Sequence, residues 1–222
     1  MRPIKLLFIV LMIIPFAASS QSIVVLEQRK INFNLSIDKE VEEWNQSFYS
    51  YNNLSKEEKE ILYWTNYSRK DPVRFWDSVM VPILTVFPQL RGKFATSLKS
   101  DLFAAGRLPL FGLNDTLNYT AKNHALDIGL KTASISHTST NGTRFAERLQ
   151  NVGVRNCGSE NMSLGNGDVL MSVAMLYLDH GLENLGHRKT LLNKEYTHIG
   201  VGATSYGNNQ LFFVQDFACN QQ

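Results

Sequence analysis

Four side chains between residues 136 and 188 are of the types that bind metal ions or move protons. His137 and His187 offer imidazole nitrogens, and Glu147 and Glu160 offer carboxylates. A neutral imidazole is a common ligand for zinc, and a nearby carboxylate can orient that ring, accept a proton or complete the coordination. If the four groups converge, they form a small metal or acid–base site. Spacing alone does not show convergence, because the turn between the two glutamates has no specified geometry.

The order of the short motifs around these residues is more specific than any single motif. In chain order they read A-K-N-H-A-L-D-I, S-H-T, A-E-R-L, S-E-N-M, G-H-R-K-T-L-L, H-I-G-V-G-A and Q-L-F-F-V-Q-D-F. This order resembles the CAP superfamily, the SCP-like extracellular proteins that include cysteine-rich secretory proteins, antigen 5 and pathogenesis-related 1. The upstream text T-N-Y-S-R-K-D-P-V-R-F resembles the opening helix of bacterial members.

The resemblance implies a set of site residues. The family's four cleft positions fall on residues of the expected types, with two supporting residues beside them: His137, Glu147, Glu160 and His187, then Asn161 and Arg188. Two departures affect the rim of the cleft. The chain reads Y-L-D-H-G-L-E-N-L before G-H-R, where many members have a Trp and a short Ser-containing segment, and it has S-E-N in place of G-E-N.

The resemblance also implies the fold, an α+β three-layer α-β-α sandwich with a small antiparallel sheet covered by helices on both faces. Local patterns agree with it. A capping-box pattern at Ser55 starts a helix that ends before Pro72, and a second helix follows Asn114. A third runs from an N-cap at Asp168 to a stop at His180 and Gly181, and the last two apolar segments predict a hairpin.

The remaining histidines have patterns typical of structural residues. His124 lies on the apolar stripe of the second helix, so we expect a packed and hydrogen-bonded ring. His180 lies near the end of a helix, where a cation suits the helix dipole, and His198 begins a strand. In contrast, His137 lies in a polar loop and His187 in a turn after Gly186, which are better positions for function.

The chain divides into a targeting segment, an extension and one domain. Residues 1–20 have a basic start, an apolar run and a small-residue exit, which predicts a signal peptide and a secreted or periplasmic protein. Residues 21–54 are polar without a sustained period, with one short helix near 39–48. The CAP-like domain then spans 55–222, and residues 73–113 interrupt it as an insertion. We expect the insertion to form helices packed on the core, although it could also present apolar surface to a lipid.

Charge and hydropathy exclude some partners. Removing Arg2 and Lys5 from 22 basic residues leaves 20 against 20 acidic residues, so the mature chain is formally neutral. A nucleic-acid binder would show a basic excess or stripe. The chain also has no stretch of about 18 uninterrupted apolar residues, so no stable membrane span is expected.

Cys157 and Cys219 are the two cysteines of the chain. In an exported protein a disulfide between them would persist, and it would contribute roughly 3 to 5 kcal/mol for a loop of this size. The alternatives are two free thiols, or Cys157 as an additional metal ligand.

Two classes of function follow. The first is a secreted binding module for a lipid, sterol or extracellular protein, with zinc or another divalent cation held between His137 and His187. CAP proteins are usually described as signalling, defence or lipid-binding modules, which favours this class. The second is a metal-dependent, peptidase-like hydrolase in which Glu160 or Glu147 is the general base. The absence of H-E-x-x-H and G-x-S-x-G motifs weighs against the hydrolase.

Overall fold

A four-stranded sheet with the strand order β1-β3-β4-β2 forms the centre of the structure. The computed structural model describes residues 29–155 and 157–220, so the predicted signal peptide and the first residues of the extension lie outside the described residues. The strands are β1 (Gly112–Leu113), β2 (Gly158–Gly165), β3 (His198–Tyr206) and β4 (Gln210–Ala218). The predicted hairpin is confirmed as β3 and β4, and β2, which carries Glu160, lies at one edge of the sheet.

The sheet is mixed rather than wholly antiparallel, which corrects the sequence prediction. β2, β4 and β3 are antiparallel neighbours, but β1 pairs with β3 in parallel. Gly112 N donates to Thr197 O at 2.9 Å, and Asn114 N donates to Ile199 O at 2.9 Å. A two-residue strand carries too little alternation to be recognised from its own residues.

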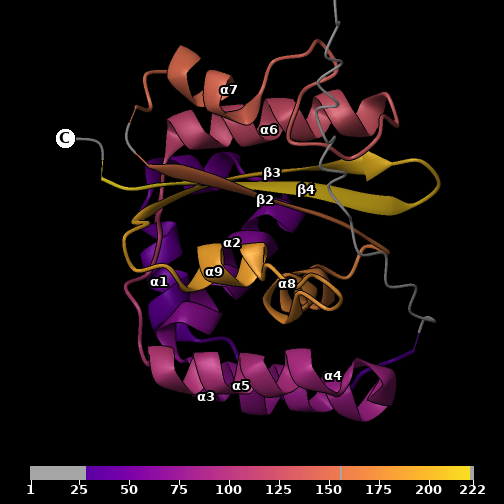
Figure 1. Ribbon diagram of the computed structural model, residues 1–222. Coiled ribbons are helices and arrows are strands. Elements are labelled where there is room, and N and C mark those ends of the chain that lie inside the picture. The colour runs from indigo at the N-terminus through magenta and orange to yellow at the C-terminus, as the bar shows by residue number, and fades with distance from the viewer. Residues whose placement is uncertain (1–28, 156, 221–222) are drawn as a thin grey trace, which may run out of the picture.

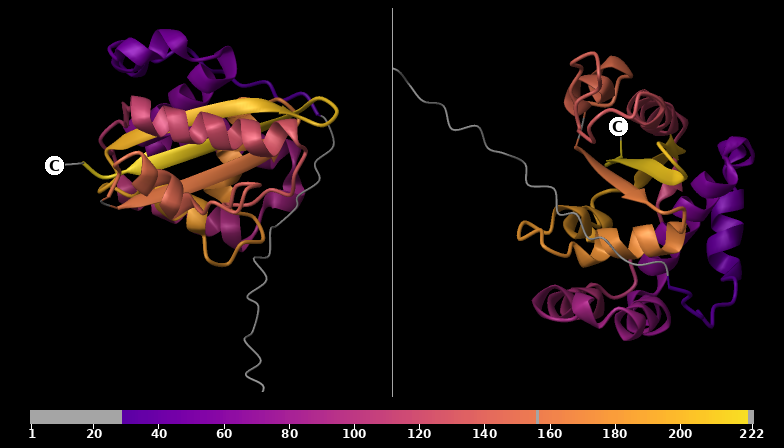
Figure 2. Two further views of the ribbon diagram at one scale, coloured as in Figure 1. Left: turned by 90° about the horizontal axis from the view of Figure 1, so that it is seen from above. Right: turned by 90° about the vertical axis from the view of Figure 1, so that its right-hand side faces the viewer.

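Helices cover both faces of the sheet, as the resemblance implies. α6 (Asp115–Leu130) and α7 (Phe145–Asn151) lie over one face, and α2 (Lys56–Lys70), α8 (Val169–Leu178) and α9 (Gly186–Leu192) lie over the other (Figure 1 and Figure 2). The main apolar core lies between the sheet and the second group of helices, and a smaller one lies under α6. The predicted α+β sandwich of three layers is therefore confirmed.

Two glycines of β3 allow α6 to lie directly on the sheet. A Cβ atom on Gly200 would stand 2.0 Å from the carbonyl carbon of Leu117, and one on Gly202 would stand 2.4 Å from the Cα of Lys122. Because the obstructing atoms belong to the helix backbone, any larger residue would push α6 away from the sheet. The H-I-G-V-G-A motif therefore reflects a close contact that sets the position of α6.

Most predicted helix boundaries are confirmed, and two differ. The capping box at the start of α2 is present, and Asn114 and Asp168 cap α6 and α8. However, α8 ends at Leu178, before the predicted stop, because its C-cap Asp179 adopts the left-handed backbone conformation with φ 49° and ψ 38°. His187, which was predicted in a turn, lies in the first turn of α9.

Residues 73–113, the segment predicted to be an insertion, form helices that share the main core. They are, in chain order, α3 (Pro72–Phe75), the π-helical turn η2 (Trp76–Met80), α4 (Val81–Val86), η3 (Pro88–Leu90) and α5 (Lys93–Ala105). Ile83 of α4 and Leu98 and Leu102 of α5 are fully buried. The predicted packing of this segment on the core is therefore confirmed.

The N-terminal extension lies against the core as an extended strap. Between residues 29 and 37, the apolar side chains of Ile31, Phe33 and Leu35 pack on the main core and alternate with exposed residues. This alternation is typical of a strand, which corrects the prediction that the stretch has no sustained period. The predicted short helix is present as α1 (Lys39–Gln46), and η1 (Tyr49–Asn53) follows it.

A disulfide joins Cys157 and Cys219, as predicted. It ties the residue before β2 to the residue after β4, and Cys219 N also donates to Cys157 O at 3.2 Å. Because both sulfur atoms are consumed in this bond, Cys157 is not available as a metal ligand.

We predict that the double substitution Cys157→Ser/Cys219→Ser lowers the free energy of unfolding by about 4 kcal/mol, because it removes a cross-link between residues 62 apart in sequence. Chemical denaturation measures the change, and the reduced wild-type protein should give the same value. An unchanged midpoint in the double variant would contradict the prediction.

Candidate functional site

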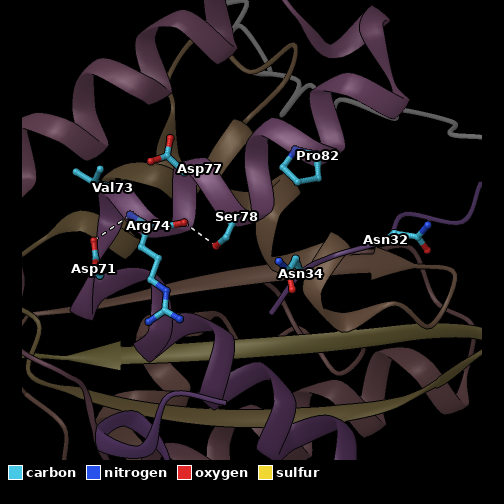
Figure 3. Close-up of a pocket in the computed structure, with 8 residues that line it drawn as sticks. All are labelled: Asn32, Asn34, Asp71, Val73, Arg74, Asp77, Ser78 and Pro82. Carbon is cyan, nitrogen blue, oxygen red and sulfur yellow. Dashed lines mark hydrogen bonds between the residues drawn. The ribbon is translucent and has the colours of Figure 1, made fainter. Parts of the chain in front are cut away.

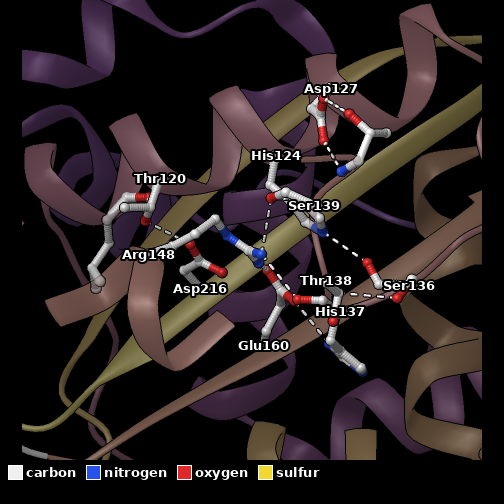
Figure 4. Close-up of polar contacts among 12 residues, drawn as sticks. Thr120, His124, Asp127, Ser136, His137, Thr138, Ser139, Arg148, Glu160 and Asp216 are labelled. Carbon is white, nitrogen blue, oxygen red and sulfur yellow. Dashed lines mark hydrogen bonds and ion pairs between the residues drawn. The ribbon is translucent and has the colours of Figure 1, made fainter. Parts of the chain in front are cut away.

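Glu160 is the centre of a buried polar cluster at the edge of the sheet (Figure 4). Its side chain is fully buried, one oxygen is 2.8 Å from Nδ1 of His137, and the other accepts from the guanidinium of Arg148. Burial alone would raise the pKa of Glu160, but the hydrogen bond from His137 and the positive charge of Arg148 together lower it. Glu160 is therefore an ionised carboxylate that forms an ion pair with Arg148 and accepts a hydrogen bond from the ring of His137.

The loop that carries His137 is held by His124 and Arg148. Nε2 of His124 lies 2.9 Å from Ser136 O, so Nε2–H donates and Nδ1 accepts from Ser139 Oγ at 3.2 Å. Burial lowers the pKa of His124, which agrees with a neutral ring. Arg148 Nη1 also donates to His137 O at 2.9 Å. The predicted structural role of His124 is confirmed, and its function is to fix the loop beside it.

Asp216 of β4 is a second buried carboxyl group in the cluster, and sequence reasoning missed it. It lies directly opposite Glu160 in the sheet, and Thr120 Oγ1 donates to its Oδ2 at 2.6 Å. Burial raises the pKa of Asp216 well above its ordinary value, and the charge of Glu160 and a hydrogen bond with it raise the pKa further. Oδ1 has no other hydrogen-bond partner, so when it is protonated its O–H can donate to Glu160. Asp216 is therefore a neutral acid beside the ion pair of Glu160 and Arg148.

His187 is held by a different buried carboxylate, Asp179. Its Nδ1 lies 2.6 Å from Asp179 Oδ1, and the Asp179 side chain is fully buried. Both histidines thus place Nδ1 against a carboxylate, and within residues 29–155 and 157–220 no hydrogen bond involves either Nε2. Two neighbouring residues of β2 contact the two histidines in different ways. Glu160 holds the ring of His137, and Asn161 Nδ2 is 3.5 Å from the backbone oxygen of His187.

Among the described residues, no hydrogen bond or ion pair joins Glu147 to His137, Glu160 or His187, and none joins His187 to His137 or Glu160. The Glu147 carboxylate accepts from Arg144 N at 2.8 Å and from Arg144 Nη2 at 2.7 Å, at the start of α7. These hydrogen bonds with Arg144 lower the pKa of Glu147. The structure therefore gives Glu147 a helix-capping contact, and its catalytic assignment stays a prediction.

The supporting residues and the other histidines have structural contacts. The guanidinium of Arg188 is buried and donates to Tyr177 O and Leu178 O, both at 2.8 Å, at the end of α8. His180 packs beside the ring of Phe94 with a centroid separation of 5.4 Å. His198 Nδ1 is 2.9 Å from the hydroxyl of Thr197.

Comparison with known proteins identifies the family. A family model described as the cysteine-rich secretory protein family, CAP, matches residues 62–217. The chain belongs to the CAP family. Among curated proteins, none matches the chain.

Two solved structures similar to this CAP protein are bacterial. An extracellular protein containing an SCP domain from Bacillus anthracis is 21% identical, with a TM-score of 0.46 over 74% of this chain and 40% of that protein. An outer surface protein from Borrelia burgdorferi is 22% identical, with a TM-score of 0.43 over 63% of this chain and 92% of that protein. The chain thus covers 40% of the length of the first protein.

The residues around the two histidines offer few donor atoms for a metal ion. Among the described residues, no three His, Cys, Asp or Glu side chains gather in a group that could hold a metal ion. Glu160 and Asp179 are occupied by Arg148 and by the two imidazoles. The remaining donors are the Nε2 atoms of His137 and His187, fewer than the three protein ligands of catalytic zinc sites.

A separate groove of about 540 Å³ lies between the extension and the inserted helices (Figure 3). It is lined mostly by polar residues, which are Asn32, Asn34, Asp71, Val73, Arg74, Asp77, Ser78 and Pro82. Arg74 and Ser78 are joined within it by a 2.6 Å hydrogen bond from the serine hydroxyl to the arginine carbonyl. None of the predicted site residues lines this groove.

We predict that Asp216→Asn loses less stability than the wild type does as the pH rises above the ordinary aspartate pKa of 3.8. A pKa raised by folding gives stability that is fully present below the ordinary pKa of 3.8 and is lost as the pH rises through the folded value. Asparagine cannot ionise and can still accept from Thr120. Denaturation between pH 5 and 9 should show a smaller loss of unfolding free energy with rising pH in the variant. Parallel pH profiles would contradict the assignment of a proton to Asp216.

We predict that Glu160→Gln lowers the free energy of unfolding by about 3 kcal/mol, because it leaves the buried Arg148 without its anionic partner. Glu147→Gln is the matched control, since it alters a more exposed pair with Arg144 and should cost much less stability. Equal losses measured by urea denaturation would contradict the central position of Glu160.

Proposed function

We propose that this CAP protein is an extracellular binding module whose cleft holds a divalent cation, most simply zinc, weakly between His137 and His187. One observation carries the proposal: Nδ1 of each ring is hydrogen-bonded to a buried carboxylate. Nε2 of each ring is therefore the nitrogen left to bind a metal ion. A carboxylate behind an imidazole is the usual arrangement around a metal-binding histidine, because it fixes the ring and raises its basicity. Bound there, the cation would supply open coordination positions to a ligand.

The alternative, a hydrolase with Glu160 or Glu147 as general base, has less support. Glu160 is already paired with Arg148, and Glu147 with Arg144, and these partners lower the pKa of each carboxyl group. A general base works best with a pKa near the operating pH, whereas these groups are shifted away from it. Binding without catalysis is therefore the better account of the cluster.

The proposed partner is an extracellular ligand, with a protein favoured over a lipid. Apolar residues of the insertion mostly lie in the core, and Val73, Val81 and Phe103 are only 37 to 46% exposed. Among the described residues, no helix is both long and apolar enough to cross a bilayer. The disulfide supports an oxidising compartment, which agrees with the predicted secreted or periplasmic location.

Calorimetric titration of metal-stripped protein with zinc tests the proposal. We expect one binding event in the wild type and at least about tenfold weaker binding, ~1.4 kcal/mol, in His137→Ala/His187→Ala. The matched control is His180→Ala/His198→Ala, which removes two imidazoles outside the cleft and should bind like the wild type. Absence of zinc binding in the folded wild type would refute the cation site, and equal losses in both double variants would refute its location.

A further inference from the structure

Asp179 has an unusual backbone conformation for a residue with a side chain. It ends α8 with φ 49° and ψ 38°, while its N–H donates to Met175 O at 3.0 Å. The left-handed region is most often occupied by glycine, although Asp and Asn tolerate it better than other residues do. Glycine would therefore relieve the backbone strain at this position. A fully buried carboxylate there needs an explanation other than the termination of the helix.

Both oxygens of Asp179 have assigned partners. Oδ1 faces Nδ1 of His187 at 2.6 Å, and Oδ2 accepts from the backbone N–H of Arg188 at 2.9 Å. The backbone N–H can only donate, so Oδ2 is committed to it. The position of that N–H is fixed in turn, because the Arg188 guanidinium donates to Tyr177 O and Leu178 O. Rotation of the carboxylate is thus prevented from both sides.

We propose that Asp179 is a positioning residue that selects the tautomer of His187. The fixed carboxylate oxygen requires a proton on Nδ1 of the neutral ring, and this leaves the lone pair on Nε2. The tautomer follows from the hydrogen bonds of Asp179 alone and does not depend on the proposed function. Only the binding of a metal ion by the Nε2 lone pair rests on the proposed function.

The chemistry of asparagine makes the assignment testable. In Asp179→Asn the amide oxygen must face the backbone N–H of Arg188, because the amide NH₂ group and this N–H are both donors and cannot face each other. The amide NH₂ group then faces Nδ1 of His187. Nδ1 must accept, so the proton moves to Nε2 and the lone pair is lost from that atom. A substitution of nearly equal size therefore reverses the tautomer.

Long-range ¹⁵N–¹H NMR correlation of histidine-labelled full-length protein tests the proposal directly. Spectra are recorded at a pH above which the His187 signals no longer move. We expect a protonated Nδ1 and an unprotonated Nε2 in the wild type and the reverse in Asp179→Asn. The matched control Asp168→Asn, at the other end of α8, keeps a good N-cap and should leave His187 unchanged.

A wild-type ring protonated on Nε2 would overturn the proposal, and this measurement needs no variant to fold. A folded Asp179→Asn protein with the wild-type tautomer would overturn it as well. Zinc titration separates this inference from the proposed function. We expect Asp179→Asn to bind zinc about 10- to 100-fold more weakly. If the wild type shows the expected tautomer but binds no zinc, the proposed function fails and the role of Asp179 stands.

Discussion

The pairing of Glu160 with Arg148 is the interaction on which the site depends. A carboxylate buried in a sheet is costly unless a cation and hydrogen bonds compensate for its lost hydration. Arg148 supplies the charge, and the same guanidinium holds the backbone of His137. Because Arg148 belongs to α7, the ion pair also attaches that short helix to the sheet edge. Asp216 can lie beside this pair only as a neutral acid, since a second anion would have no cation to balance it.

β2 joins two halves of the site because its side chains alternate between the faces of the sheet. Glu160 points toward α6 and α7, where His137 is held. Its neighbours Ser159 and Asn161 contact α9, through a 2.8 Å hydrogen bond to Thr190 and a 3.5 Å contact with His187 O. The edge position of β2 lets groups from both helical layers approach one strand. His137 is therefore held by Glu160 of the strand and by Arg148 of α7, whereas His187 is held by Asp179 at the end of α8.

The sequence was informative where a pattern is local and less so where the contact is distant. The capping box of α2 is a recognisable local motif, and the apolar face of α6 and the final hairpin each have a recognisable period. The order of motifs placed His137 and Glu160 together. Asp216 could have been noticed as an acid within the apolar run L-F-F-V-Q-D-F. Asp179 gave no such signal, because its role depends on a backbone conformation and on an amide nine residues away. The parallel pairing of β1 likewise depends on the folded chain.

Arg188 connects α5 to the start of α9, where His187 lies. Besides the end of α8, its guanidinium donates to Ser97 Oγ at 2.9 Å, to Asp101 at 3.0 Å and to Phe94 O at 3.0 Å, all in α5. Removing α5 would leave a buried guanidinium without these acceptors, next to the residue that carries the cleft imidazole. A chain shortened by the removal of α5 would therefore lose contacts that hold Arg188, and with it the start of α9, where His187 lies.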